Sequence, residues 1–66
     1  MRIQLNGAWQ ELPFAPTLAA LLQVCGYGAS TVATAVNGEF VPSQARAGLT
    51  LHDGDRVEVL APMQGG

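Results

Sequence analysis

The sequence predicts a small α+β domain in which a mixed sheet of four to five strands carries one main helix on one face. Two Asn-Gly pairs, Asn6-Gly7 and Asn37-Gly38, each lie between short segments rich in strand-forming residues, as in β-hairpins. Between these hairpins, apolar residues recur at helical spacing. With 66 residues, the chain is long enough for one domain with a thin core.

The first hairpin comes at the start of the chain. Met1 to Leu5 alternates between apolar and polar residues, which is the period of a half-buried strand. The first Asn-Gly pair turns the chain, and Ala8 to Leu12 forms the returning strand. This register points Leu12 inward and Trp9 outward.

The helix follows two prolines and begins after Thr17, whose hydroxyl can cap it. Its apolar stripe at i, i+3, i+4 and i+7 consists of Leu18, Leu21, Leu22 and Cys25. Gly26 and Gly28 can end the helix in the left-handed conformation, which makes it roughly nine residues long. The pattern makes Cys25 a small core residue; a sulfur-relay thiol is the alternative.

The second half of the chain predicts three more strands. Thr31 to Val36 is rich in β-branched residues, and Glu39 to Val41 returns across the second Asn-Gly pair. Pro42 ends this strand, and Ser43 to Gly48 is a loop with room for one helical turn.

The last strand, Arg56 to Leu60, follows a turn at Asp53-Gly54-Asp55. The residues expected to face the core here are Leu49, Leu51, Val57 and Val59. The order ββ-α-ββ-β is that of the β-grasp fold. Its first and last strands pair in parallel, and one sheet face stays open. We therefore expect a domain at 1–60 and an exposed, flexible tail at 61–66.

Composition excludes several classes of function. The net charge is −2, and the only cationic side chains besides one His are three scattered arginines, so we expect no nucleic-acid partner. One Cys excludes an internal disulfide, and no Cys/His spacing suggests a metal site. No signal peptide or transmembrane-length segment is visible, which predicts a cytoplasmic protein without a membrane partner. A core this thin leaves no enclosed active site, so we expect no enzyme.

The tail ends in Gly65-Gly66, and the carboxylate of Gly66 is the candidate reactive group. A carboxylate is a poor acyl donor, but transfer of AMP from ATP would supply a leaving group. A sulfur nucleophile could then form a thiocarboxylate. Gln64 and Gly65 belong to the segment that must enter a partner's active site, where glycine adds no side chain.

Apolar residues near the tail are candidates for docking to a partner, namely Leu60, Met63 and Phe40. For Phe40 and Trp9, a place at the edge of the core is the favoured interpretation, and partner docking is the alternative. His52 has no evident catalytic partner and is expected at the surface. Asp53 and Asp55 are expected to serve the turn rather than a metal ion.

The chain resembles the thiamine-biosynthesis sulfur carrier family (ThiS), a ubiquitin-like β-grasp family, over essentially its whole length. The residues that carry this resemblance are Ala35 to Pro42, Asp53 to Val57 and the terminal Gly-Gly. Two departures from the family pattern concern partner contacts: Ser43 stands where a basic residue is common, and Pro62 stiffens the base of the tail.

The resemblance implies a carrier that catalyses nothing and binds no cofactor of its own. An E1-like adenylyltransferase of the ThiF type would use ATP and magnesium to adenylate Gly66. A cysteine desulfurase or sulfurtransferase would supply sulfur, and a thiazole synthase of the ThiG type would take it. The alternatives are a carrier of the molybdopterin-synthase small-subunit type, a protein modifier of the ubiquitin kind, and a β-grasp interaction module with an incidental tail.

Overall fold

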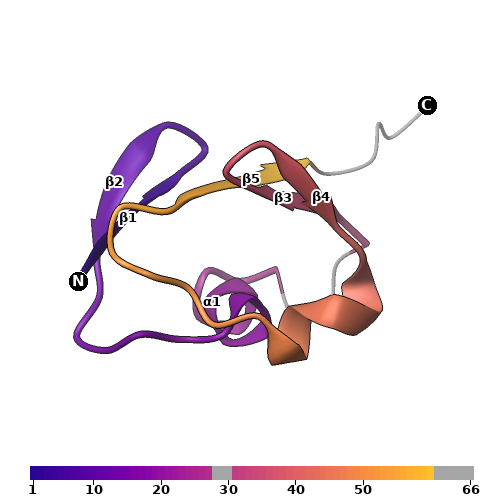
Figure 1. Cartoon of the computed structure of the whole chain (residues 1–66), viewed down its shortest axis with the longest axis horizontal. Helices are drawn as coiled ribbons and strands as arrows, with labels where there is room; N and C mark the ends of the chain where they lie inside the picture. Colours follow the sequence, from indigo (N-terminus) through magenta and orange to yellow (C-terminus); the bar gives the residue numbers. More distant parts are fainter. Residues whose placement is uncertain (28–30, 61–66) are drawn as a thin grey trace.

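Two hairpins and a final strand form a five-stranded sheet in the order β2-β1-β5-β3-β4 (Figure 1). In this computed structural model, which describes residues 1–27 and 31–60, the strands are β1 (Arg2–Leu5), β2 (Ala8–Glu11), β3 (Ala33–Val36), β4 (Glu39–Val41) and β5 (Arg56–Leu60). β1 pairs with β5 in parallel, whereas β5 with β3 and each hairpin pair are antiparallel. The mixed sheet and the parallel pairing of the first and last strands are confirmed.

Both hairpins turn at their Asn-Gly pairs with nearly the same geometry. The φ angles are 51° and 84° at Asn6 and Gly7, and 52° and 85° at Asn37 and Gly38. Positive φ at both central residues defines the type I′ turn, whose twist matches that of the strands it joins. The two turns thereby determine the register of both hairpins.

The helix α1 (Leu18–Val24) covers one face of the sheet, as predicted (Figure 1). The Thr17 hydroxyl accepts a hydrogen bond from the Ala20 backbone N–H at 3.1 Å, which confirms the predicted cap. The helix has seven residues rather than nine, because Cys25 is its C-cap and Gly26 turns the chain with φ at 89°.

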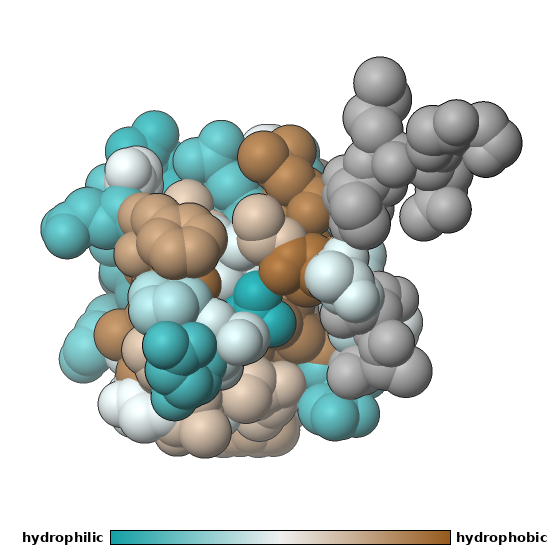
Figure 2. All heavy atoms as spheres, turned by 90° about the vertical axis from the view of Figure 1, so that its right-hand side faces the viewer, coloured by the Kyte–Doolittle hydropathy of each residue, from teal (hydrophilic) through white to brown (hydrophobic). Residues whose placement is uncertain are grey.

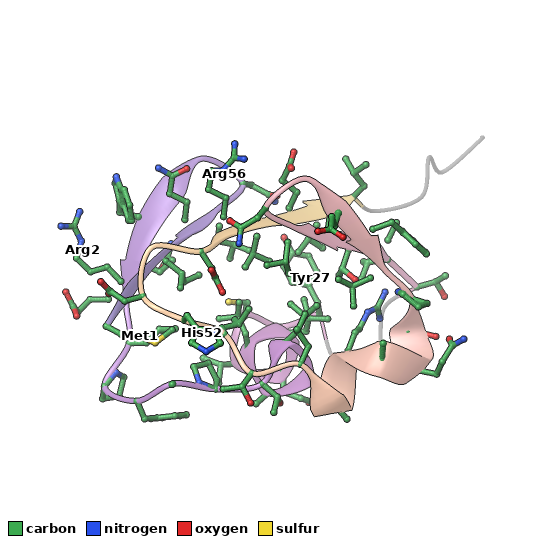
Figure 3. All side chains as sticks on the ribbon, viewed as in Figure 1. Met1, Arg2, Tyr27, His52 and Arg56 are labelled. Carbon is green, nitrogen blue, oxygen red and sulfur yellow. The ribbon has the colours of Figure 1, made fainter. Side chains whose placement is uncertain are left out.

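The core lies between α1 and the sheet. Its buried hydrophobic members among the described residues are Ile3, Leu18, Leu21, Leu22, Val32, Val41, Leu51, Val57 and Val59. Tyr27 extends between helix and sheet and packs against this core from its edge (Figure 3). Leu12, Cys25 and Leu49 are partly buried against the core, so the predicted inward positions are confirmed.

The segment after β4 is more ordered than expected. Ser43–Gly48 forms a 3₁₀ helix, η1, in place of a loop with a single turn. Its Arg46 donates from Nε to Thr34 Oγ1 at 3.0 Å and from Nη2 to the Val32 carbonyl at 2.6 Å. Thr34 is 2% exposed and donates its hydroxyl hydrogen to the Val41 carbonyl at 2.8 Å. This polar network fastens η1 to the sheet.

Three strands are shorter than predicted. β1 begins at Arg2 rather than Met1. β3 begins at Ala33 rather than Thr31, because Ala33 already lies opposite Leu60, the last residue of β5. β2 ends at Glu11, although Leu12 still donates its backbone N–H to the Met1 carbonyl at 2.7 Å. Of the helices that the structure describes, none is long and apolar enough to span a membrane.

Candidate functional site

The predicted reactive end of the chain lies beyond β5. β5 lies between β1 and β3 in the sheet, and Leu60 is its last residue. Met63, Gln64, Gly65 and Gly66 lie outside the described residues, so their predicted roles stay predictions. The candidate site that the structure describes is therefore the sheet surface from which the tail continues.

The open face of the sheet, opposite α1, has a shallow apolar depression next to the end of β5. Cross-strand pairing places Ala33 opposite Leu60, and Ala35 opposite both Phe40 and Glu58. Two small side chains thus lie between two large ones. The resulting hollow of about 120 Å³ is lined by Ala33, Thr34, Ala35, Phe40, Glu58 and Leu60.

Phe40 and Leu60 are the exposed walls of this hollow. Their exposed fractions are 70% and 71%, although both are large apolar side chains. Figure 2 views the side toward which β5 runs and shows hydrophobic side chains in its upper, sheet-forming part. Two of the three predicted docking residues therefore share one surface.

Phe40 and Trp9 were both considered as residues at the edge of the core, and neither belongs to the core. Phe40 is the more exposed of the two, and Trp9 is 51% exposed. Trp9 lies on β2, and the guanidinium of Arg2 stacks over its ring, 4.4 Å from the ring centroid. The outward direction predicted for Trp9 is confirmed.

The other candidate reactive side chains have structural roles or are exposed to solvent. Cys25 is half-buried against the core, and His52 is exposed. Asp53 Oδ1 accepts the Arg2 backbone N–H at 2.7 Å, and Asp55 Oδ2 accepts the His52 backbone N–H at 2.8 Å. Over residues 1–27 and 31–60, no group of three or more His, Cys, Asp or Glu is placed to hold a metal ion.

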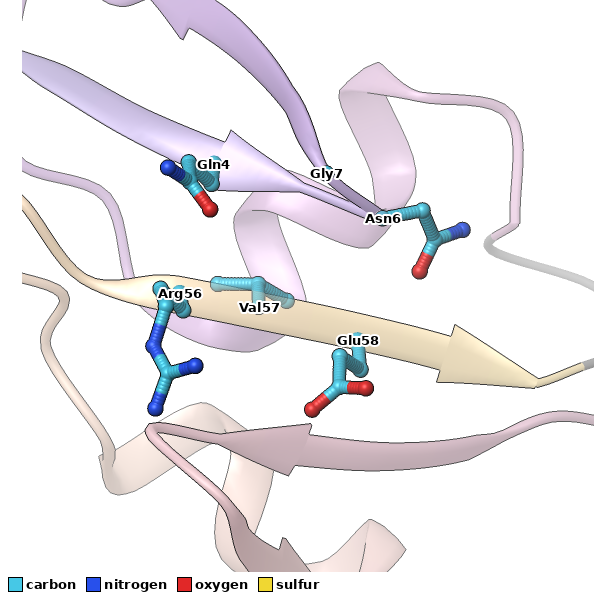
Figure 4. A pocket seen from close by; sticks show the side chains of 6 residues that line it. All are labelled: Gln4, Asn6, Gly7, Arg56, Val57 and Glu58. Carbon is cyan, nitrogen blue, oxygen red and sulfur yellow. The ribbon is translucent and has the colours of Figure 1, made fainter.

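A second depression, of about 390 Å³, lies beside the first three residues of β5 (Figure 4). It is lined by Gln4, Asn6, Gly7, Arg56, Val57 and Glu58. Its lining is mainly polar, in contrast to the apolar hollow beyond Glu58. Arg56 projects from the outer side of the sheet (Figure 3).

Sequence reasoning missed two kinds of residue on this surface. Ala33 and Ala35 are small residues whose importance comes from the larger neighbours across the strands. Asn6 and Asn37 were identified only as turn residues, yet both side chains bind β5. Asn6 Oδ1 accepts the Val59 N–H at 2.8 Å, and Asn37 Oδ1 accepts the Arg56 N–H at 3.0 Å. The signal that could have indicated this role is that the same Asn-Gly pair occurs at both turns, and that both hairpins flank the last strand in the predicted sheet.

Known proteins share this architecture. The chain superposes on a crystal structure of a thiamine biosynthesis protein (ThiS) from Geobacter metallireducens with a TM-score of 0.86 and 29% identity, and each chain is covered in full. The solution NMR structure of a thiamine biosynthesis protein from the same organism gives a TM-score of 0.83 at 29% identity. This superposition covers 100% of this chain and 88% of that one. The predicted β-grasp fold is confirmed.

A curated relative is a much longer protein. The chain is 33% identical over 66 residues to a thiazole synthase from Paramagnetospirillum magneticum (strain ATCC 700264 / AMB-1), and it spans 20% of that protein's length. The model of the ThiS family matches residues 3–66, which begin within β1 and include both Asn-Gly turns, the helix, β5 and the terminal Gly-Gly. The chain therefore belongs to the ThiS family.

Proposed function

We propose that this chain is a sulfur carrier for formation of the thiazole moiety of thiamine, with Gly66 as the residue that carries the sulfur. The observation that carries this proposal is the extent of the family match, which runs through Gly65 and Gly66. The superposition on a ThiS structure at full coverage of both chains supports it.

The chemistry proposed for Gly66 has two steps. First, a carboxylate oxygen attacks the α-phosphorus of ATP on an E1-like adenylyltransferase, and pyrophosphate leaves. Second, hydrosulfide attacks the carbonyl carbon, and AMP leaves with one of the two carboxylate oxygens. The hydrosulfide comes from the persulfide of a desulfurase or sulfurtransferase, from which a thiol reductant releases it and is itself oxidised to a disulfide. The product is a thiocarboxylate, and the ATP and magnesium belong to the activating enzyme.

The open sheet face is the proposed docking surface for these partners. Phe40 and Leu60 expose about seven-tenths of their surface on either side of a hollow that is large enough for one side chain of a partner. Glu58 lines the same hollow, so the matching surface would present an apolar side chain beside a cationic one. Met63 would extend this contact along the tail.

A thiazole synthase is the proposed acceptor of the sulfur. The thiazole synthase of Paramagnetospirillum magneticum contains a segment similar to this whole chain within a much longer protein. A chain that combines both parts is expected where a carrier and its acceptor act together. In this proposal the carrier is a co-substrate of its partners and performs no catalysis itself.

The test is mass spectrometry of the purified chain after incubation with ATP, magnesium, an adenylyltransferase of the ThiF type and a sulfur source. We expect replacement of one oxygen by one sulfur, located at Gly66 by fragmentation. A variant lacking Gly66 is the control and should gain no sulfur. A wild-type chain that stays unmodified while a known ThiS protein is converted in parallel would contradict the proposal.

The same samples distinguish the alternatives. Stable co-purification with a molybdopterin-synthase large subunit would favour that type of carrier. Covalent attachment of Gly66 to amino groups of other proteins would indicate a modifier. A chain that needs neither Gly65 nor Gly66 for its activity in cells would be a plain interaction module.

A further inference from the structure

The central strand β5 has unequal support along its two edges. On one edge, β3 pairs with β5 as far as Leu60, which lies opposite Ala33. On the other edge, β1 pairs only through Gln4 with Arg56 and Leu5 with Val57. The chain then turns away into β2, so β1 offers no strand residue to the last three residues of β5.

The side chain of Asn6 takes the place of the missing strand. Its backbone N–H donates to the Val57 carbonyl at 2.9 Å, and its Oδ1 accepts the Val59 N–H at 2.8 Å. Figure 4 shows Asn6 at the end of β1, beside the C-terminal half of β5. Over the described residues, this bond is the last hydrogen bond on that edge of β5, one residue before Leu60.

We propose that Asn6 is a positioning residue for the carrier tail. By binding Val59 it keeps β5 in the sheet to its last residue, so that the tail starts from a fixed point beside the docking hollow. The effect on loading with sulfur rests on the proposed function. The effect on the order of β5 does not.

Asn37 provides a matched control within the same molecule. It occupies the same position of the same turn type, with φ at 52° against 51° for Asn6. Its N–H donates to the Arg56 carbonyl at 2.7 Å, and its Oδ1 accepts the Arg56 N–H at 3.0 Å. Because β3 runs antiparallel to β5, this turn lies at the beginning of β5 rather than at its end.

The decisive comparison is Asn6→Gly against Asn37→Gly. Glycine adopts positive φ without strain, so each variant keeps its turn and loses the side-chain oxygen that accepts a hydrogen bond from β5. Asn37→Gly also loses the hydrogen bond that Asn37 Nδ2 donates to Asp55 Oδ1 at 3.0 Å. We expect Asn6→Gly to speed amide hydrogen exchange at Val59 by roughly three- to tenfold, the factor that one hydrogen bond contributes, and to speed exchange at Leu60 as well. Asn37→Gly should speed exchange at Arg56 and leave Val59 unchanged. Asn6→Asp, which retains an oxygen acceptor, should restore slow exchange.

Loading kinetics provide the second measurement. With the activating enzyme, Asn6→Gly should lower kcat by roughly the same three- to tenfold, because tail placement changes. KM should stay unchanged, because the docking face is intact. Asn37→Gly should load like the wild type. Equal Val59 exchange in Asn6→Gly and wild type would overturn the proposal, as would equal loss of kcat in both glycine variants. If the wild type is not loaded at all, the proposed function fails, and the exchange data alone decide the role of Asn6.

Discussion

Truncation of Phe40 to alanine separates docking from folding. Phe40 is 70% exposed, and a phenylalanine buries about 200 Å² when fully enclosed, so about 140 Å² is available to a partner. At about 25 cal/mol per Å², covering this area is worth at most about 3.5 kcal/mol. The actual loss is smaller than this upper limit, because the alanine side chain still contacts the partner and the partner does not cover the whole ring. We therefore expect Phe40→Ala to lose about 1.5–3 kcal/mol of binding free energy.

The cost to folding should be smaller. The remaining three-tenths of the Phe40 surface is already covered within the domain, which limits the loss of unfolding free energy to about 1.5 kcal/mol. A domain of 66 residues has an unfolding free energy of roughly 3–10 kcal/mol, so the variant should remain folded. Urea unfolding followed by circular dichroism checks this.

The assay is ATP–pyrophosphate exchange by the activating enzyme at increasing carrier concentration. Every 1.4 kcal/mol is a factor of ten, so KM for the Phe40→Ala carrier should rise roughly tenfold to a hundredfold. Phe14→Ala is the matched control: Phe14 is 59% exposed but lies between β2 and α1, away from the hollow, so KM should not change. A folded Phe40→Ala carrier with wild-type KM would refute the assignment of the open face as the docking surface.

Three further predictions concern the scaffold. Gly54→Ala should lower the free energy of unfolding by about 1–2 kcal/mol in urea, because Gly54 has φ at 88°, although there is open space for a Cβ. Gly48 has no positive φ, so Gly48→Ala should be neutral or stabilising. Equal effects of the two substitutions would contradict backbone strain as the cause. Thr34→Val should lower the free energy of unfolding by about 1–3 kcal/mol, because the Val41 carbonyl and Nε of Arg46 both lose their hydroxyl partner. An unchanged melting temperature would contradict the importance of that network. Cys25→Ala should lower stability slightly and leave sulfur loading unchanged, since Cys25 packs partly against the core; complete loss of loading in the folded variant would instead indicate a relay thiol.

The hairpins and the helix were predictable because their signals are local. Asn6-Gly7 and Asn37-Gly38 determine a turn type and a register without reference to the rest of the chain. The helix was predictable from Thr17 and the apolar spacing that follows it. Once these elements were placed, the parallel pairing of β5 with β1 followed from their order.

The rest depends on contacts between distant residues. The 3₁₀ helix at Ser43–Gly48 has no apolar period, and it is fastened by Arg46 to Thr34 and Val32, which precede it by 12 and 14 residues. Phe40 is one of three residues in β4, too few to show which face it occupies. The hollow beside it exists only because the register places Ala33 and Ala35 next to large neighbours, a feature that no single segment encodes.

The central claim is that sulfur passes through Gly66 to the thiazole ring. The most direct measurement is a single-turnover reaction in which this chain, loaded with isotopically labelled sulfur at Gly66, is mixed with a thiazole synthase, its other substrates and an excess of unlabelled sulfur donor without ATP. The account predicts that the labelled sulfur appears in the thiazole product, in an amount equal to the carrier consumed. Thiazole that contains only unlabelled sulfur, with the label still on the carrier, would contradict it.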